Sequence, residues 1–266
     1  MDARTWLGLE PTEDPTQWRL PITPGISTGG NFLFGGSGLA AGIAAMEATS
    51  GRPVVWATAQ YLSYARPPSV MDIDVRIAVA GHQITQARAV CHVGDDEILT
   101  VNAALGSRPM EVSGEWAVRP GAPSPDDCPL RQHRHHHQGE TIMSRLEQRV
   151  VGGRDLDQLD GTPGTGRTLM WVRVPDLIEM SGPALAILGD YVPSGISQAL
   201  GLQAGGNSLD NTLRVARLVP TEWVLLDIRI HAVANGFAHG LVHEWAEDGT
   251  LLATASQSAI VRFWKD

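Results

Sequence analysis

Cysteines, long apolar runs and basic residues are all scarce in this sequence, and each shortage excludes a class of protein. Two cysteines among 266 residues cannot form the disulfide framework of a small secreted protein, so we expect a reducing, cytoplasmic location. No stretch approaches the roughly 18 consecutive apolar residues of a membrane-spanning helix. The acidic, proline-containing N-terminal segment also lacks the apolar core of a signal peptide. The sequence therefore predicts a soluble protein that does not act in a membrane.

Basic residues are outnumbered by acidic ones. The chain has 20 Lys and Arg against 29 Asp and Glu, which gives a formal net charge of −9 at pH 7. Such a protein repels nucleic acid and anionic membrane surfaces, so we expect neither as a partner. Hydrophobic residues make up 43% of the chain and charged residues 18%. This composition suits a folded core and is unlike that of a disordered chain.

An apolar segment in the first half predicts a helix that is buried on all sides. Within residues 35–50, none of residues 38–46 is charged, and most are small. A surface helix needs a polar face, so this helix belongs in the interior. The chain then alternates between strand-like segments and short turns, which predicts an antiparallel sheet curled around the helix. The predicted strands are 54–65, 71–80, 84–93 and 98–106.

The second half of the chain repeats this order. A leading strand at 168–175 precedes an apolar helix at 184–200, whose first part we expect Pro193 to bend or end. The strand pattern of residues 73–77 recurs at 226–230, so two copies of one unit in tandem is the economical interpretation. The further predicted strands are 208–219, 223–233, 237–246 and 251–264.

The duplication predicts how the chain is divided. We expect an N-terminal unit at 1–110, a linker rich in proline and glycine at 111–138, and a C-terminal unit at 139–266 that opens with an edge strand at Glu147. Fusing two such units lets their sheets pair edge to edge, and the remaining outer faces predict a homodimer. The tryptophans expected on or beside those faces are Trp56, Trp223 and Trp264.

Several segments carry a family resemblance, in order along the chain. They are Phe34-Gly35-Gly36-Ser37-Gly38 at the helix entry, Tyr61-LSYARP on the first long strand, Leu209-DNTLRVARLVPTEWVLL, and Asp248-GTLLATASQSAIVR near the end. With them, the sequence resembles the acyl-CoA thioesterase II family over most of its length. The resemblance implies an α+β double hotdog, in which two tandem antiparallel sheets are each wrapped around a central helix.

The resemblance also implies a hydrolytic site in the second unit. In the family an aspartate, a Thr or Ser, and a glutamine together orient a water molecule. The aspartate corresponds to Asp210 and the glutamine to Gln257, whereas the position of the hydroxyl falls near Ala232 or Val233, which have none. The nearest polar residues are His231 and Asn235, and we take His231 as the candidate replacement, because a histidine can donate or accept near neutral pH.

Each of these three residues also has a structural interpretation. Asp210 follows a turn-prone run and suits a solvated strand end, and Gln257 suits the outward face of an alternating strand. His231 suits a strand edge where the backbone satisfies its ring.

The two glycines at the helix entry are candidate substrate-binding residues. Gly35 and Gly36 begin the apolar helix, where free backbone N–H groups could receive an oxyanion; alternatively, they only let the entering loop cross the sheet. The histidine-rich run at 133–137 lacks a neighbouring acid or cysteine at ligand spacing, so we expect no dedicated metal site and no cofactor. Cys91 suits an inert core thiol.

Three functions follow for comparison. The first is an acyl-CoA thioesterase that acts on acyl-CoA or another acyl thioester and releases a carboxylic acid and CoA. The second is a double hotdog protein that binds acyl thioesters without hydrolysing them, since the hydroxyl is missing from the expected position. The third, a hotdog hydratase, ranks last because the Gly189-Asp190-Tyr191-Val192-Pro193 segment lacks the Asn and His of the hydratase motif.

Overall fold

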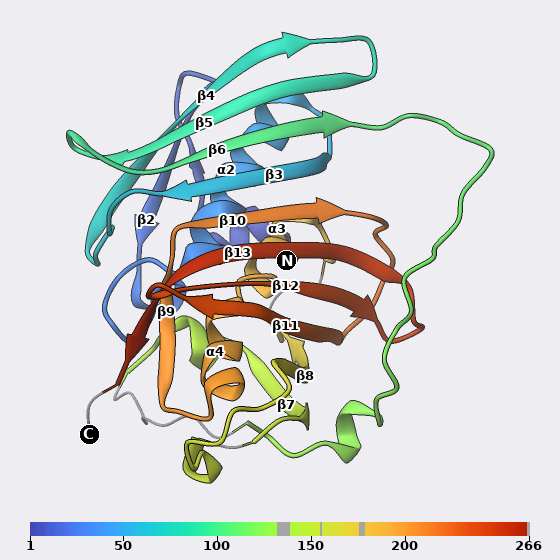
Figure 1. Ribbon diagram of the computed structural model, residues 1–266. Coiled ribbons are helices and arrows are strands. Elements are labelled where there is room, and N and C mark those ends of the chain that lie inside the picture. The colour runs from blue at the N-terminus through green and yellow to red at the C-terminus, as the bar shows by residue number, and fades with distance from the viewer. Residues whose placement is uncertain (132–138, 155, 176–178, 265–266) are drawn as a thin grey trace.

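The computed structural model describes residues 1–131, 139–154, 156–175 and 179–264, and these form one large antiparallel sheet with its α-helices on one side (Figure 1). The strands are β1 (Glu10–Pro11), β2 (Gln17–Ile22), β3 (Val54–Tyr61), β4 (Ser69–Ala80), β5 (Ile84–Val93), β6 (Asp96–Gly106), β7 (Glu147–Gly152), β8 (Arg167–Arg173), β9 (Ala204–Ser208), β10 (Asp210–Val215), β11 (Val224–Ala234), β12 (Phe237–Ala246) and β13 (Leu251–Phe263).

The helices of the described residues are few and short, with one exception. The α-helices are α1 (Ala3–Leu7), α2 (Gly35–Ser50), α3 (Gly182–Leu188) and α4 (Val192–Leu200). The 3-10 helices are η1 (Pro24–Ile26), η2 (Pro125–Asp127), η3 (Ile142–Arg145) and η4 (Leu156–Gln158). None of the described helices combines the length and the apolar character needed to cross a bilayer.

The two halves of the chain meet along one pair of strands. The strand order is β1-β2-β4-β5-β6-β3-β10-β13-β12-β11-β8-β7, and β9 pairs with the end of β13. The first half supplies the part up to β3 and the second half supplies the rest, so the pairing of β3 with β10 joins the two sheets edge to edge (Figure 1). Strand β7 lies at the outer edge, as predicted. Strands β1 and β2 and helix α1 were not predicted.

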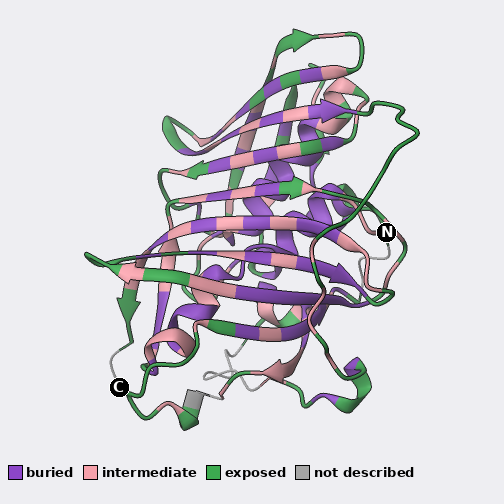
Figure 2. Ribbon diagram, turned by 45° about the vertical axis from the view of Figure 1, so that its right-hand side comes forward, coloured by how far each residue is buried: buried purple, intermediate pink, exposed green. Residues whose placement is uncertain are grey.

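Helix α2 lies in the interior because it has no polar face. Residues 36–46 are all buried, in agreement with the prediction from composition (Figure 2). Its small residues let the sheet approach closely: a Cβ on Gly42 would lie 2.8 Å from Cγ2 of Val101. The helix ends at Gly51, whose φ of 66° is readily adopted by glycine.

The second apolar helix is interrupted near Pro193, the residue expected to bend or end its first part, but the interruption comes just before the proline. It is broken into α3 and α4, and the break at residues 189–191 comes before Pro193. Pro193 lies in the first turn of α4, where its missing N–H has no intrahelical partner to lose. The break sets Asp190 beside the first turn of α2, which packs against α3.

The described part of the linker covers the outer face of the second sheet. The indole N–H of Trp171 donates to the carbonyl oxygen of Pro123 at 3.0 Å, and Glu115 accepts from the Leu251 N–H at 3.0 Å. Under this cover Cys128 packs with a group of tryptophans, so Trp223 is buried rather than on an open face. The buried tryptophans of this group are Trp171, Trp223 and Trp245.

Candidate functional site

The break between α3 and α4 carries a buried carboxylate. Asp190 is 7% exposed and its Oδ2 accepts a hydrogen bond from the backbone N–H of Gly36 at 2.6 Å. The same carboxylate accepts, through Oδ1, a hydrogen bond from the side-chain amide of Gln257. A carboxylate from the second unit therefore binds the first turn of the central helix of the first unit, where free N–H groups favour negative charge.

Gln257 connects this carboxylate to a hydroxyl. Its amide nitrogen also donates to Oγ of Ser208 at 3.0 Å, and its Oε1 accepts from the Val192 N–H at 3.1 Å. The side chain is 2% exposed and points inward from β13, whose residue Ala259 pairs with Ser208 of β9. With both amide atoms engaged, the orientation of Gln257 is fixed between Asp190 and Ser208.

Burial sets the ionisation of this site. Desolvation raises the pKa of Asp190 from 3.8 to about 7, against the opposing effect of the hydrogen bonds from Gln257 and Gly36. Near neutral pH the group therefore exists both as a carboxylate and as an acid. A carboxylate with a pKa in this range can take a proton from water and return it later, as general acid-base catalysis requires.

The two glycines at the start of α2 make room for the carboxylate. A Cβ on Gly36 would lie 2.8 Å from the carbonyl oxygen of Ala186, and one on Gly35 would lie 2.8 Å from Oδ2 of Asp190. Contacts this short are not tolerated, so glycine lets Asp190 approach the helix. The Gly36 N–H, expected as an oxyanion donor, is occupied by Asp190. The expected role of the pair in binding substrate stays a prediction.

Asp210, the carboxylate expected from the family resemblance, lies elsewhere. Its Oδ1 accepts from the backbone N–H of Ser258 at 2.8 Å, and the residue is half-buried. In β10 the buried side chains are Asn211 and Leu213, so alternation places Asp210 on the opposite face of the strand from the interior. In the structure Gln257 therefore contacts Asp190, whereas Asp210 is hydrogen-bonded to the backbone of the neighbouring strand.

Sequence reasoning missed two members of the buried cluster. The expected position of the hydroxyl, near Ala232 or Val233, lies on β11, whereas Ser208 lies just before Asp210 in the chain. A signal for Asp190 was present: it is the one charged residue in the apolar segment 184–200, and a charge in a buried segment is costly without a partner. From the sequence we expect an apolar helix there and compare residues 189–193 with a hydratase motif, without giving Asp190 a role.

The ring contact described for His231 is with another histidine and not with the Asp190 cluster. It sits at an irregularity in the pairing of β11 with β12, is exposed, and packs edge-on against the ring of His239 at 5.7 Å between ring centroids. Among the residues that the structure describes, no group of three His, Cys, Asp or Glu side chains could hold a metal ion. The histidine run at 133–137 lies outside the described residues.

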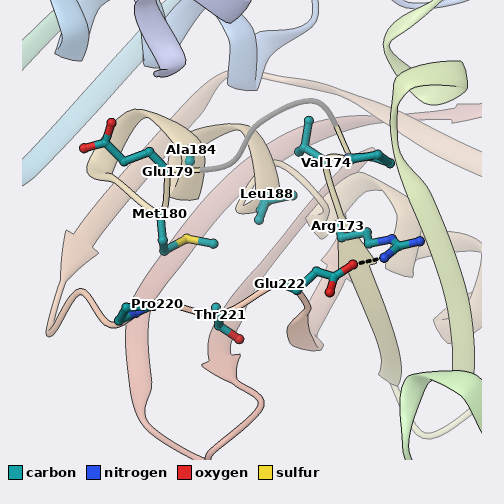
Figure 3. A pocket seen from close by; sticks show the side chains of 10 residues that line it. Arg173, Val174, Glu179, Met180, Ala184, Leu188, Pro220, Thr221 and Glu222 are labelled. Atoms are coloured by element: carbon teal, nitrogen blue, oxygen red, sulfur yellow. Dashed lines mark hydrogen bonds and ion pairs between the residues drawn. The ribbon is translucent and has the colours of Figure 1, made fainter. Parts of the chain in front are cut away.

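A pocket of about 560 Å³ opens beside α3 (Figure 3). It has an apolar wall and a charged rim where Arg173 pairs with Glu222. None of the residues lining it belongs to the Asp190 cluster, but Leu188 of its wall lies two positions before Asp190. The apolar wall is formed by Val174, Met180, Ala184 and Leu188.

Comparisons with known proteins agree with this fold. The model of the acyl-CoA thioesterase C-terminal domain matches residues 125–261. A candidate thioesterase of Novosphingobium aromaticivorans is 32% identical, with a TM-score of 0.86, over 95% of this chain and 97% of that one. The search of curated proteins gave no match.

Two more distant solved structures share the fold. A hot dog fold protein of unknown function from Alicyclobacillus acidocaldarius is 19% identical with a TM-score of 0.84, over 96% of both chains. An acyl-CoA thioesterase II of Mycobacterium marinum is 20% identical with a TM-score of 0.76, over 99% of both chains. The double hotdog and the family resemblance expected from the sequence are confirmed.

Proposed function

The chain belongs to the acyl-CoA thioesterase family, a family of thioester hydrolases, and from this premise we propose that it hydrolyses an acyl-CoA thioester with a water molecule held by Asp190, Ser208 and Gln257. The observation that carries the proposal is the fixed amide of Gln257, which joins a buried carboxylate to a hydroxyl. The family resemblance implies a carboxylate, a hydroxyl and an amide. The proposed site keeps Gln257 as the amide, but takes Asp190 and Ser208 in place of the carboxylate and hydroxyl positions expected from the sequence.

The reaction needs only water and these residues. As the water oxygen attacks the carbonyl carbon, its proton passes to the Asp190 carboxylate and the C=O electron pair moves onto the carbonyl oxygen. The tetrahedral intermediate then collapses, the C–S bond breaks, and the departing thiolate takes the proton from Asp190. A carboxylic acid and CoA leave, and the carboxylate is regenerated. Ser208 and Gln257 orient the water before attack.

The surroundings favour Asp190 over Asp210 as the base. Asp190 is buried, has a pKa near neutrality and contacts Gln257, whereas Asp210 is half-buried and lies on the opposite face of β10 from the interior. The acyl chain is proposed to lie along the apolar helices, where the wall of the pocket beside α3 is apolar. The nucleotide would then stay near the surface.

Two isosteric variants test the choice of carboxylate. We expect Asp190→Asn to keep the fold and to lose about two to four orders of magnitude in kcat, measured over a panel of acyl-CoA chain lengths. Asp210→Asn is the matched control and should stay within a few-fold of the unmodified protein. If Asp210→Asn loses the activity and Asp190→Asn keeps it, Asp210 is the base, as expected from the sequence, and the assignment of Asp190 is wrong.

The alternative is a double hotdog protein that binds acyl thioesters without turnover. Its original support was the missing hydroxyl, and Ser208 now supplies one beside Gln257. Binding of acyl-CoA with no release of free thiol over the whole chain-length panel would favour this alternative.

A homodimer and a cytoplasmic location remain part of the proposal. The linker exposes apolar side chains, including Trp116 at 88% exposure, which a partner could cover. Both cysteines are free and buried, which suits a reducing compartment. Light scattering that gave the monomer mass of 28.5 kDa at micromolar concentration would contradict the dimer.

A further inference from the structure

Two buried polar side chains next to the Asp190 cluster have no use in the hydrolysis described so far. Asn211 is 1% exposed, and neither its amide oxygen nor its amide nitrogen has a well-formed hydrogen bond within the described chain. The hydroxyl of Tyr61 is closed off from solvent and likewise makes no well-formed hydrogen bond there, although the Asn211 amide lies close to it. Buried polar groups are normally well paired, so these two neighbours keep hydrogen-bonding capacity that a bound ligand can use.

The strand pairing places both groups on the same inner face. Asn211 of β10 is opposite Ala59 of β3, and Tyr61 is two residues further along β3, so its side chain points to the same side as that of Ala59. The Asn211 amide is close enough to affect the pKa of the Tyr61 phenol. The two side chains therefore form one polar group at the strands that join the two units.

This polar group faces the Asp190 carboxylate. A Cβ on Gly35 would lie 3.0 Å from Oη of Tyr61 and 2.8 Å from Oδ2 of Asp190, so both oxygens border the same point at the start of α2. Gln257 donates to the other oxygen, Oδ1. Tyr61 therefore approaches the carboxylate from the side of Oδ2.

The phenol remains a hydrogen-bond donor at physiological pH. Burial, together with the nearby carboxylates of Asp190 and Asp210, raises the pKa of Tyr61 well above its ordinary value. A neutral phenol beside a general base can donate to a developing negative charge without competing for the proton of the water.

We propose that Tyr61 is a further catalytic residue, whose phenol donates a hydrogen bond to the thioester carbonyl oxygen as it becomes an oxyanion, with the Asn211 amide as a second donor. This proposal rests on the hydrolysis proposed above. No additional reactant is required: the proton stays on the phenol, the negative charge on the carbonyl oxygen is stabilised by the hydrogen bonds, and it returns to the C=O bond when the C–S bond breaks. The Gly36 N–H is not available as the oxyanion donor, because it already donates to Asp190.

The test compares Tyr61→Phe with Tyr191→Phe in the full-length protein. Both substitutions remove one buried hydroxyl that makes no well-formed hydrogen bond in the described chain, so they are matched in chemistry and in the burial of the hydroxyl. We expect Tyr61→Phe to lower kcat roughly 10²-fold with little change in KM, and Tyr191→Phe to leave kcat within about twofold. Asn211→Leu, of similar volume, should also lower kcat. The melting temperature of each variant is measured in parallel.

The pH profile separates a direct role from an indirect one. If Tyr61 touches the oxyanion, the pH at half-maximal kcat stays the same in Tyr61→Phe, because Asp190 is still the base. A shift of that midpoint, or a loss of stability with kcat preserved, would show that Tyr61 only positions Asp190 or pairs with Asn211, and would overturn the proposal.

The activities of Asp190→Asn and of the unmodified protein distinguish a failure of the role of Tyr61 from a failure of the proposed function. If Tyr61→Phe has the same kcat as the unmodified protein while Asp190→Asn is inactive, the role of Tyr61 is wrong and the proposed hydrolysis is still supported. If the unmodified protein releases no thiol from any acyl-CoA of the panel, the proposed function fails and the role of Tyr61 fails with it.

Discussion

The side-chain amide of Gln257 donates to the carboxylate of Asp190, which lies 67 positions earlier in the chain. The strand of the second hotdog and the break in its helix meet there, against the first turn of the helix of the first hotdog. The amide is held in place by a second hydrogen bond, which its oxygen accepts from the Val192 N–H. The carboxylate that we propose as the base is thus held by both units of the duplicated fold.

The pH dependence of activity should report Asp190. Its pKa is raised to about 7 in the folded protein, and the base acts only when deprotonated. We therefore expect kcat to fall below neutral pH and to level off above about pH 8. A titration of initial rates with a single acyl-CoA, from pH 5 to 9, measures the midpoint. A rate that is flat from pH 5 to 7 would contradict this assignment.

Gln257→Ala should change both the rate and this midpoint. The Gln257 amide donates to the charged form of Asp190, so its removal raises the pKa of Asp190 further and moves the acid limb to higher pH. We expect kcat to fall about tenfold to several hundredfold, because one oriented dipole is lost and the base remains. A reduced rate with an unmoved midpoint would mean that Gln257 does not act through Asp190.

Ser208 should be required for its hydroxyl rather than its size. Ser208→Ala removes the partner of the Gln257 amide at 3.0 Å, and we expect a loss of about tenfold or more in kcat. Ser208→Thr keeps the hydroxyl and should recover most of the rate. Steady-state kinetics of the pair, at saturating substrate, decide the point; equal rates for both variants would exclude a role of the hydroxyl.

His231→Ala should leave the activity close to that of the unmodified protein. The ring is exposed and contacts His239 on the neighbouring strand, so it has no contact through which to orient the water. Because surface substitutions of this kind change stability by less than about 0.5 kcal/mol, the melting temperature should also be unchanged. A hundredfold loss of kcat would restore His231 as the replacement for the missing hydroxyl.

Glu244→Gln should stabilise the protein at alkaline pH. Glu244 is fully buried, both carboxylate oxygens lack partners in the described chain, and burial raises its pKa well above 4.5. The folded protein therefore keeps a proton that the unfolded chain releases, and this group reduces stability as pH rises above the unfolded pKa.

The glutamine variant cannot ionise, so its advantage should grow with pH, by up to about 1.4 kcal/mol per pH unit, until the folded pKa is reached. Urea unfolding of both proteins at pH 5 and pH 8 measures the difference. An unchanged difference between the two pH values would show that Glu244 ionises at the same pH in both states.

Much of the fold followed from patterns that are local in the sequence. A long apolar run of small residues without charges predicted the interior helix, and the alternation in 71–80 and 84–93 predicted strands close to those observed. The recurrence of one strand pattern at 73–77 and 226–230 predicted the duplication. The boundaries at 1–110, 111–138 and 139–266, as separate folding units, stay a prediction.

The choice of Asp190 as the proposed base rests on the tertiary structure. Asp210 and Asp190 both precede Gln257 in the chain, and only the sheet register turns the first toward a backbone N–H while the helix break turns the second toward Gln257. The Gly36 N–H that completes the site lies 154 residues from Asp190. Local patterns fix which face of a strand or helix is apolar; they do not fix which polar groups from two distant elements come within hydrogen-bonding distance.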